Sequence, residues 1–149
     1  MFLVEFRHGC FLFCLMLALA TMSRPFTTKP QESEWDKHTS AGLSAREARQ
    51  FKEAERELQA ALKEAEAFHQ SDSRLAESLS NLADLYGAQG NYNQAMQFES
   101  RLLAVREKTL GPNHEVVATI LVDLGNMEWQ SGKQAEAEST VKRALAIRC

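Results

Sequence analysis

The sequence predicts an all-α protein, an α-solenoid of about three helical hairpins that follows an N-terminal signal segment. Two observations lead to this fold class. Glycine and proline account for only 7 and 3 of the 149 residues, while alanine, glutamate, glutamine and leucine are abundant, which favours helices over sheets. The second half of the chain also repeats itself at a spacing of 42 residues, which is typical of stacked structural repeats.

Composition and charge narrow the class of protein further. A hydrophobic fraction of 44% and a charged fraction of 25% argue against general disorder, and the length suggests one domain. Lysine plus arginine number 17 and aspartate plus glutamate 20, so the net charge is −3. This balance argues against binding to nucleic acid or to an anionic membrane through bulk charge.

Residues 1–20 are typical of a secretory signal peptide. Residues 10–20 form an apolar run of 11 residues without a charge, which is shorter than the ~20 residues that a membrane-spanning helix needs but suits a signal core. Because Ala18 and Ala20 supply small residues at the cleavage positions, we expect cleavage before Thr21 and export as a periplasmic or secreted protein. Two alternatives stay open: an uncleaved segment that anchors the protein to a membrane, or a start codon placed too early.

Residues 21–34 are expected to form a flexible linker, because they combine prolines, threonines and serines without an apolar period. After cleavage the chain keeps one cysteine, Cys149, so an internal disulfide is excluded. This thiol either cross-links two chains in an oxidising compartment or stays unpaired.

The repeat is clearest when residues 75–106 are aligned with residues 117–148. Nine of the 32 aligned positions are identical, where chance gives roughly two. A shift of 41 residues adds a weaker first copy, in which Phe51 aligns with Tyr92. The repeat domain over 35–149 therefore divides into units near 35–72, 73–114 and 115–149.

Each unit is expected to form two helices. In the second unit, apolar residues recur at three- and four-residue steps from Leu75 to Tyr86 and again from Tyr92 to Val105, which makes two amphipathic stripes. Gly90 separates the stripes, because glycine readily adopts the left-handed conformation that ends a helix.

Small and helix-breaking residues mark the other turns and contacts. Gly111 and Pro112 are expected to end a helix, and Asn113 to cap the next one. Near the start of each second helix a small residue permits close approach of the two helices of a hairpin; these residues are Ala54, Ala95 and Ala137.

The first unit leaves two interpretations open. Arg49 stands where the second unit has its helix-breaking glycine, and Ala45 stands where the second unit has Tyr86. Residues 45–68 lack glycine and proline and could form one long helix. A hairpin is favoured, because the apolar residues of this segment suit a hairpin partner and Trp35 needs a surface to pack on.

Three motifs of the second unit resemble the tetratricopeptide repeat: Asn81-Leu82-Ala83-x-x-Tyr86, Gly90-x-Tyr92-x-x-Ala95 and Arg101-Leu102-Leu103. The period of 42 and the segment from Leu103 to His114 resemble the longer repeats of the kinesin-light-chain type. The resemblance covers about residues 35–149 and implies a superhelix of hairpins whose first helices line a concave groove.

The resemblance also implies a function as a protein–protein interaction scaffold or adaptor, which binds a peptide or protein segment in that groove. The candidate groove residues are Asn81, Asp84, Asp123, Asn126 and Trp129. The two asparagines resemble groove residues of the family, since an amide offers a donor and an acceptor to an extended peptide; they also suit a solvated helix surface. Trp129 either faces the groove as a binding hot spot or packs on a helix of the second unit.

Patterns that indicate catalysis, a cofactor or a metal are missing from the sequence. The histidines after residue 20 are His38, His69 and His114, and none lies in an HExxH motif. Phosphate-binding and nucleophile motifs such as GxxxxGK[ST], GxGxxG and GxSxG are also missing. We therefore expect no enzyme activity, no cofactor, no metal and no nucleic-acid partner.

The C-terminal helix suggests an alternative function. Its apolar residues Ala144, Leu145 and Ile147 lie just before Cys149, with no polar capping helix of the kind that ends most solenoids. This face would pair with another chain, fray, or belong to a longer array. The alternative is therefore a structural or assembly module, a homo-oligomer that self-associates through its C-terminal repeat.

Overall fold

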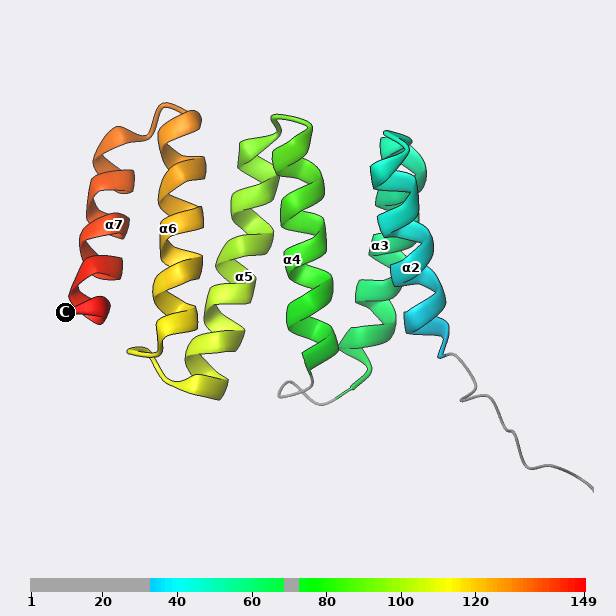
Figure 1. The fold of residues 1–149 in the computed structure, drawn as a ribbon, viewed down its shortest axis with the longest axis horizontal. Coiled ribbons are helices and arrows are strands. Elements are labelled where there is room, and N and C mark those ends of the chain that lie inside the picture. The colour runs from blue at the N-terminus through cyan, green and yellow to red at the C-terminus, as the bar shows by residue number, and fades with distance from the viewer. Residues whose placement is uncertain (1–32, 69–72) are drawn as a thin grey trace, which may run out of the picture. The chain divides into compact units, whose positions relative to one another are not determined.

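The computed structural model describes residues 33–68 and 73–149, which form six α-helices (Figure 1). In chain order they are α2 (Glu34–Glu47), α3 (Phe51–Glu66), α4 (Ser73–Ala88), α5 (Tyr92–Leu110), α6 (Glu115–Gln130) and α7 (Gln134–Arg148). Consecutive helices run antiparallel, so α2 pairs with α3, α4 with α5, and α6 with α7. The described residues contain no strand, and the predicted all-α hairpin solenoid is confirmed. The predicted signal segment and residues 21–32 of the predicted linker lie outside the described residues.

The hairpins stack on one another in chain order, α3 against α4 and α5 against α6. Their apolar stripes form one buried cluster that extends from Trp35 on α2 to Ile120 on α6, and a second cluster between α6 and α7. Leu103 packs against both clusters. The core is thus shared between neighbouring hairpins, as expected for units that bury too little surface to be stable alone.

The first unit is a hairpin, and the alternative of one long helix is wrong. α2 ends at Glu47 and α3 begins at Phe51. Between them, Arg49 adopts φ 58°, the left-handed conformation that glycine takes in the other two units. Gly90 and Gly132 have φ values of 73° and 84°. Arg49 therefore makes the same turn with a side chain that disfavours it.

The small residues near the starts of the second helices are buried as predicted: Ala54 and Ala95 are 0% exposed, and Ala137 is 3% exposed. An ion pair also recurs at equivalent positions of the repeat, and the sequence analysis did not identify it. Arg101 of α5 contacts Glu66 of α3 at 2.6 Å, and at the corresponding positions Arg143 of α7 contacts Glu107 of α5.

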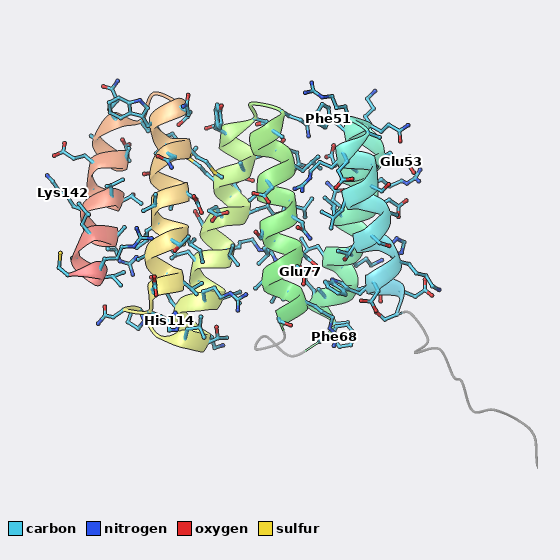
Figure 2. All side chains as sticks on the ribbon, in the orientation of Figure 1. Phe51, Glu53, Phe68, Glu77, His114 and Lys142 are labelled. Atoms are coloured by element: carbon cyan, nitrogen blue, oxygen red, sulfur yellow. The ribbon has the colours of Figure 1, made fainter. Side chains whose placement is uncertain are left out.

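Two predicted boundaries need correction. Ser33 caps α2, its side chain accepting from the Asp36 backbone N–H while Asp36 accepts in return from the Ser33 N–H, and Glu34 is already helical. The predicted linker over 21–34 therefore extends two residues too far. The cap of α6 is His114 and not Asn113: its Nδ1 accepts from the Val116 N–H at 3.1 Å (Figure 2).

Candidate functional site

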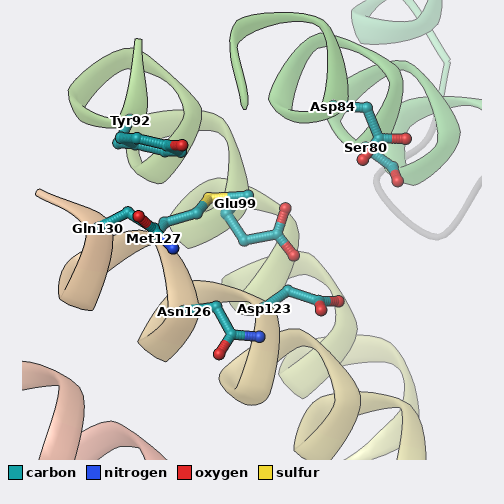
Figure 3. Close-up of a pocket in the computed structure, with 8 residues that line it drawn as sticks. All are labelled: Ser80, Asp84, Tyr92, Glu99, Asp123, Asn126, Met127 and Gln130. Carbon is teal, nitrogen blue, oxygen red and sulfur yellow. The ribbon is translucent and has the colours of Figure 1, made fainter. Parts of the chain in front are cut away.

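Helices α4, α5 and α6 enclose a pocket of about 280 Å³ that contains several polar side chains (Figure 3). The first helices α4 and α6 form its two sides, and Tyr92 and Glu99 of α5 lie between them. The other lining residues include Asp84, Asp123, Asn126 and Met127. Three of the lining side chains are acidic and none is basic.

A second pocket of about 460 Å³ lies further along the same three helices. It shares Ser80, Glu99 and Asp123 with the first pocket and adds Asn81 and Arg106. Because three residues line both pockets, the two are parts of one groove between the second and third hairpins. We call this surface the central groove.

The central groove contains four of the five predicted site residues. Asp84, Asp123 and Asn126 line its first pocket, and Asn81 lines its second. The amide nitrogen Nδ2 of Asn81 is buried and has no hydrogen-bond partner among the described residues. Asn81 therefore has hydrogen-bonding capacity that the surrounding protein does not use.

Trp129 lies elsewhere. It lines a separate pocket of about 720 Å³ formed by α6 and α7, which shares Asn126 with the central groove. Trp129 is 60% exposed, and the residues that line its pocket come from α6 and α7. Its two predicted placements, facing the groove or packed on a helix of the second unit, stay predictions. The residue is a surface aromatic on the outer side of the third hairpin.

Glu99 is the residue of the central groove that the sequence analysis missed. It is only 5% exposed, and within the described part of the chain its carboxylate forms no hydrogen bond or ion pair. Burial, together with the nearby Asp123 and Asp84 carboxylates, raises the pKa of Glu99 to about 7.

The repeat alignment contained a signal for Glu99. Shifts of 41 and 42 residues place Leu58 and Val141 at the equivalent positions of the first and third units. Leu58 is fully buried in the core and Val141 is half-buried. An acidic residue at an otherwise apolar repeat position is therefore visible in the sequence, but its burial and its acidic neighbours are not.

The two aspartates of the central groove differ in their partners. Asp84 forms an ion pair with Arg46 of α2, with 3.5 Å between the guanidinium nitrogen and the carboxylate oxygen. Burial and the charge of Asp84 raise the pKa of Asp123, while the charge of Arg148 lowers it. Arg46 of α2 and Arg148 of α7 thus compensate part of the negative charge of the groove.

The described residues give little support for a metal site, a histidine-based site or a membrane-spanning helix. No group of three or more His, Cys, Asp or Glu side chains is placed there to hold a metal ion. His38 bonds to Glu57 at 2.7 Å, His114 caps α6, and His69 lies outside the described residues. Within the described ranges, no helix has both the length and the apolar character needed to cross a membrane.

Comparison with known proteins identifies the family. Two tetratricopeptide-repeat family models match the chain, one over residues 75–115 and the other over residues 100–149. The chain belongs to the tetratricopeptide-repeat family. Repeats of this family generally form scaffolds for protein–protein interaction and are generally not enzymes.

A solved structure has the same fold as this tetratricopeptide-repeat protein. The crystal structure of BtubC (BKLC) from P. vanneervenii superposes with a TM-score of 0.69 at 21% sequence identity. The match covers 93% of this chain but only 54% of BtubC, so this chain spans about half the length of that protein. No curated protein matches the chain.

Proposed function

We propose that this tetratricopeptide-repeat protein binds an extended peptide segment of a protein partner in the central groove. The observation that supports this function is the continuity of the two pockets, which share Ser80, Glu99 and Asp123. A groove lined by consecutive hairpins offers polar groups at successive positions along its length. An extended peptide presents its backbone groups and side chains at regular intervals and can use such a surface.

The side chains and the scaffold both suit peptide binding. The amide of Asn126 can donate to a backbone carbonyl and accept from a backbone N–H of the peptide. Asn81, whose Nδ2 is buried, can accept from a backbone N–H through its carbonyl oxygen. The helices that hold these amides are packed on a buried core, so the scaffold loses little conformational freedom on binding. Most of the entropic cost then falls on the peptide.

Selection from a displayed library of random dodecapeptides on the immobilised mature chain tests the proposal. We expect enriched peptides whose affinity falls about tenfold in Asn81→Ala and in Asn126→Ala, because each variant loses hydrogen bonds to the ligand. Asn93→Ala, at an exposed position of α5, is the matched control and should bind normally. The proposal would be contradicted if the selection enriched no peptide. It would also be contradicted if the enriched peptides bound both groove variants as tightly as the wild type.

The outer face of the third hairpin supports a second candidate function, self-association through the C-terminal repeat. Leu145 is 57% exposed, whereas its repeat equivalent Leu103 is packed between hairpins. Leu145 follows the half-buried Val141 by one helical turn, and Val141 lines the pocket of Trp129. A second copy of the chain could cover these apolar side chains.

Sedimentation equilibrium tests this second function. We expect a dimer that Leu145→Lys converts to a monomer, because a charge at this exposed position opposes burial. A charge at Ala144 is unsuitable for this purpose, since Ala144 is 1% exposed and packs inside the hairpin core. A wild-type chain that stays monomeric at high concentration would exclude this function.

We also propose that the protein is exported. The apolar run over residues 10–20 and the small residues Ala18 and Ala20 support a cleaved signal peptide. N-terminal sequencing of protein from the periplasm or culture medium should begin at Thr21. A membrane-bound chain with an intact N-terminus would instead support the anchored alternative.

A further inference from the structure

The three hairpins share a packing position at which only the middle one carries a charge. Gly42 and Gly125 on the first helices face Leu58 and Val141 on the second helices so closely that an added Cβ would lie 2.6 Å from Leu58 Cγ and 2.8 Å from Val141 Cγ2. In the second unit, the residue equivalent to Leu58 and Val141 is Glu99.

A carboxylate at this position is costly for the fold. Glu99 is 5% exposed, and a buried charge without a partner opposes folding. A leucine or a valine at the same repeat position stabilises the other two hairpins through apolar burial. Packing therefore gives no reason for glutamate here, and residues that break a local rule of the fold often serve a function.

The charges that face Glu99 from the neighbouring helices are mostly of the same sign. Asp84 of α4 and Asp123 of α6 line the first pocket with it, and Glu77 of α4 lines the second. Positive groups also lie near these acids. Arg46 contacts Asp84 and Arg148 acts on Asp123, while Arg106 lines the second pocket of the groove but not the first.

We propose that the first pocket of the central groove receives a lysine or arginine side chain of the partner peptide, with Glu99 as its buried counter-charge. This inference rests on the proposed peptide-binding function and specifies the chemistry of the partner. The pocket has three acidic lining residues and no basic one, so a cation is the complementary ligand. Charge-assisted hydrogen bonds to carboxylates are stronger than neutral ones.

Aromatic and thioether groups complete the pocket. Tyr92 and Met127 line it beside Glu99 (Figure 3). A tyrosine ring attracts a cation over its face, and the methylene stem of lysine or arginine packs on apolar side chains. A metal ion is a poorer match, because the described residues offer no group of three ligands placed for one.

The peptides selected from the random dodecapeptide library test this specificity. We expect them to share one position occupied by lysine or arginine, and we expect a glutamine at that position to lower affinity about tenfold or more, because the buried carboxylate loses its partner. Glu99→Gln and Asp123→Asn should lower affinity for the basic peptide by a similar factor. Glu64→Gln removes an exposed carboxylate of α3, has the same net charge as Glu99→Gln, and should bind like the wild type.

The pH dependence of binding gives a second measurement. The pKa of Glu99 is about 7, so its carboxyl is mostly protonated at about pH 6 and mostly ionised at about pH 8. Wild-type affinity for the basic peptide should therefore rise up to roughly tenfold between these pH values. The groove also contains Asp84, Asp123, Glu77 and Arg106, whose charges act on the bound peptide as well. The deciding comparison is therefore between the wild type and Glu99→Gln, which should lose most of the rise in affinity with pH.

The outcomes separate the inference from the function on which it rests. Enriched peptides without a shared basic position, or basic peptides that bind Glu99→Gln and Glu64→Gln equally well, would overturn the cation pocket while leaving a peptide-binding groove. A library with no enrichment would overturn both. Selection of peptides that match residues 21–32 of this chain would show that the protein's own N-terminal segment occupies the groove, and a partner peptide would then be excluded as the primary ligand.

Discussion

The indole Nε1–H of Trp35 donates a buried hydrogen bond of 2.8 Å to the Ser78 hydroxyl oxygen, which connects α2 to α4 across the first two hairpins. Trp35 is 8% exposed and Ser78 is 0% exposed. The bond satisfies the only polar group of a large apolar side chain and so permits its burial. The first hairpin is therefore joined to the second by a specific contact as well as by apolar packing.

Replacement of Trp35 should show how much this contact contributes. Trp35→Phe keeps most of the apolar surface but removes the N–H, so we expect a loss of about 1–2 kcal/mol in the free energy of unfolding. Trp35→Ala should cost about 3–5 kcal/mol, because it also leaves a cavity. Urea unfolding followed by circular dichroism measures both. Equal stability of wild type and Trp35→Phe would show that the hydrogen bond contributes nothing net.

The left-handed turn at Arg49 predicts a stabilising substitution. Since Arg49 has φ 58° and its side chain is exposed, Arg49→Gly should raise the free energy of unfolding by about 1 kcal/mol through relief of backbone strain. Gly132→Ala should do the opposite by a similar amount, because its φ is 84° and no atom within 4 Å would obstruct the added Cβ. Thermal unfolding measures both variants. A destabilised Arg49→Gly variant would contradict the strain at this turn.

The helical glycines Gly42 and Gly87 should respond to alanine in opposite directions. A Cβ at Gly42 would lie 2.6 Å from Leu58 Cγ and 3.2 Å from the Leu58 backbone nitrogen, so Gly42→Ala should destabilise the fold by about 1–3 kcal/mol through overpacking. A Cβ at Gly87 would meet nothing within 4 Å, so Gly87→Ala should stabilise α4 by up to about 1 kcal/mol through its helix propensity. Chemical denaturation of the two variants provides the comparison. Similar effects of both substitutions would show that hairpin packing at Gly42 is not tight.

Glu99 makes stability depend on pH. Its pKa of about 7 in the folded protein exceeds the ordinary value of 4.5, so the folded state holds this proton more tightly than the unfolded state does. The contribution of this proton to the free energy of unfolding is therefore complete below about pH 4.5, and it is lost as the pH rises to about 7. Between about pH 5 and pH 8 the wild type should lose on the order of 2–3 kcal/mol more unfolding free energy than Glu99→Gln.

Urea unfolding at a series of pH values tests this dependence. Glu64→Gln, on the exposed face of α3, should lose stability in parallel with the wild type. At about pH 8, Glu99→Gln should be the more stable protein, since a neutral amide avoids the cost of a buried charge. Parallel curves for wild type and Glu99→Gln would show that the carboxylate is solvated in the folded protein.

The sequence by itself determined most of the architecture. The period of 42 residues, the apolar stripes and the glycines at 90 and 132 are local features, and each encodes a helix or a turn through its own few residues. They predicted the hairpins of the second and third units and the burial of Ala95 and Ala137. The first unit was less certain, because Arg49 replaces the glycine that would signal its turn, and only the packing of α2 on α3 and α4 decides that it is a hairpin.

The tertiary structure decided which predicted site residues share a surface. Asp84 and Asp123 lie on different hairpins, and their position in one groove with Glu99 depends on how α4, α5 and α6 stack. Trp129 is on the same helix as Asp123, but its place along α6 exposes it beside α7, away from the groove that the first helices form with α5. Periodicity specifies which face of a helix is apolar, whereas the burial and the pKa of Glu99 depend on the neighbours that each stacked hairpin places around that face.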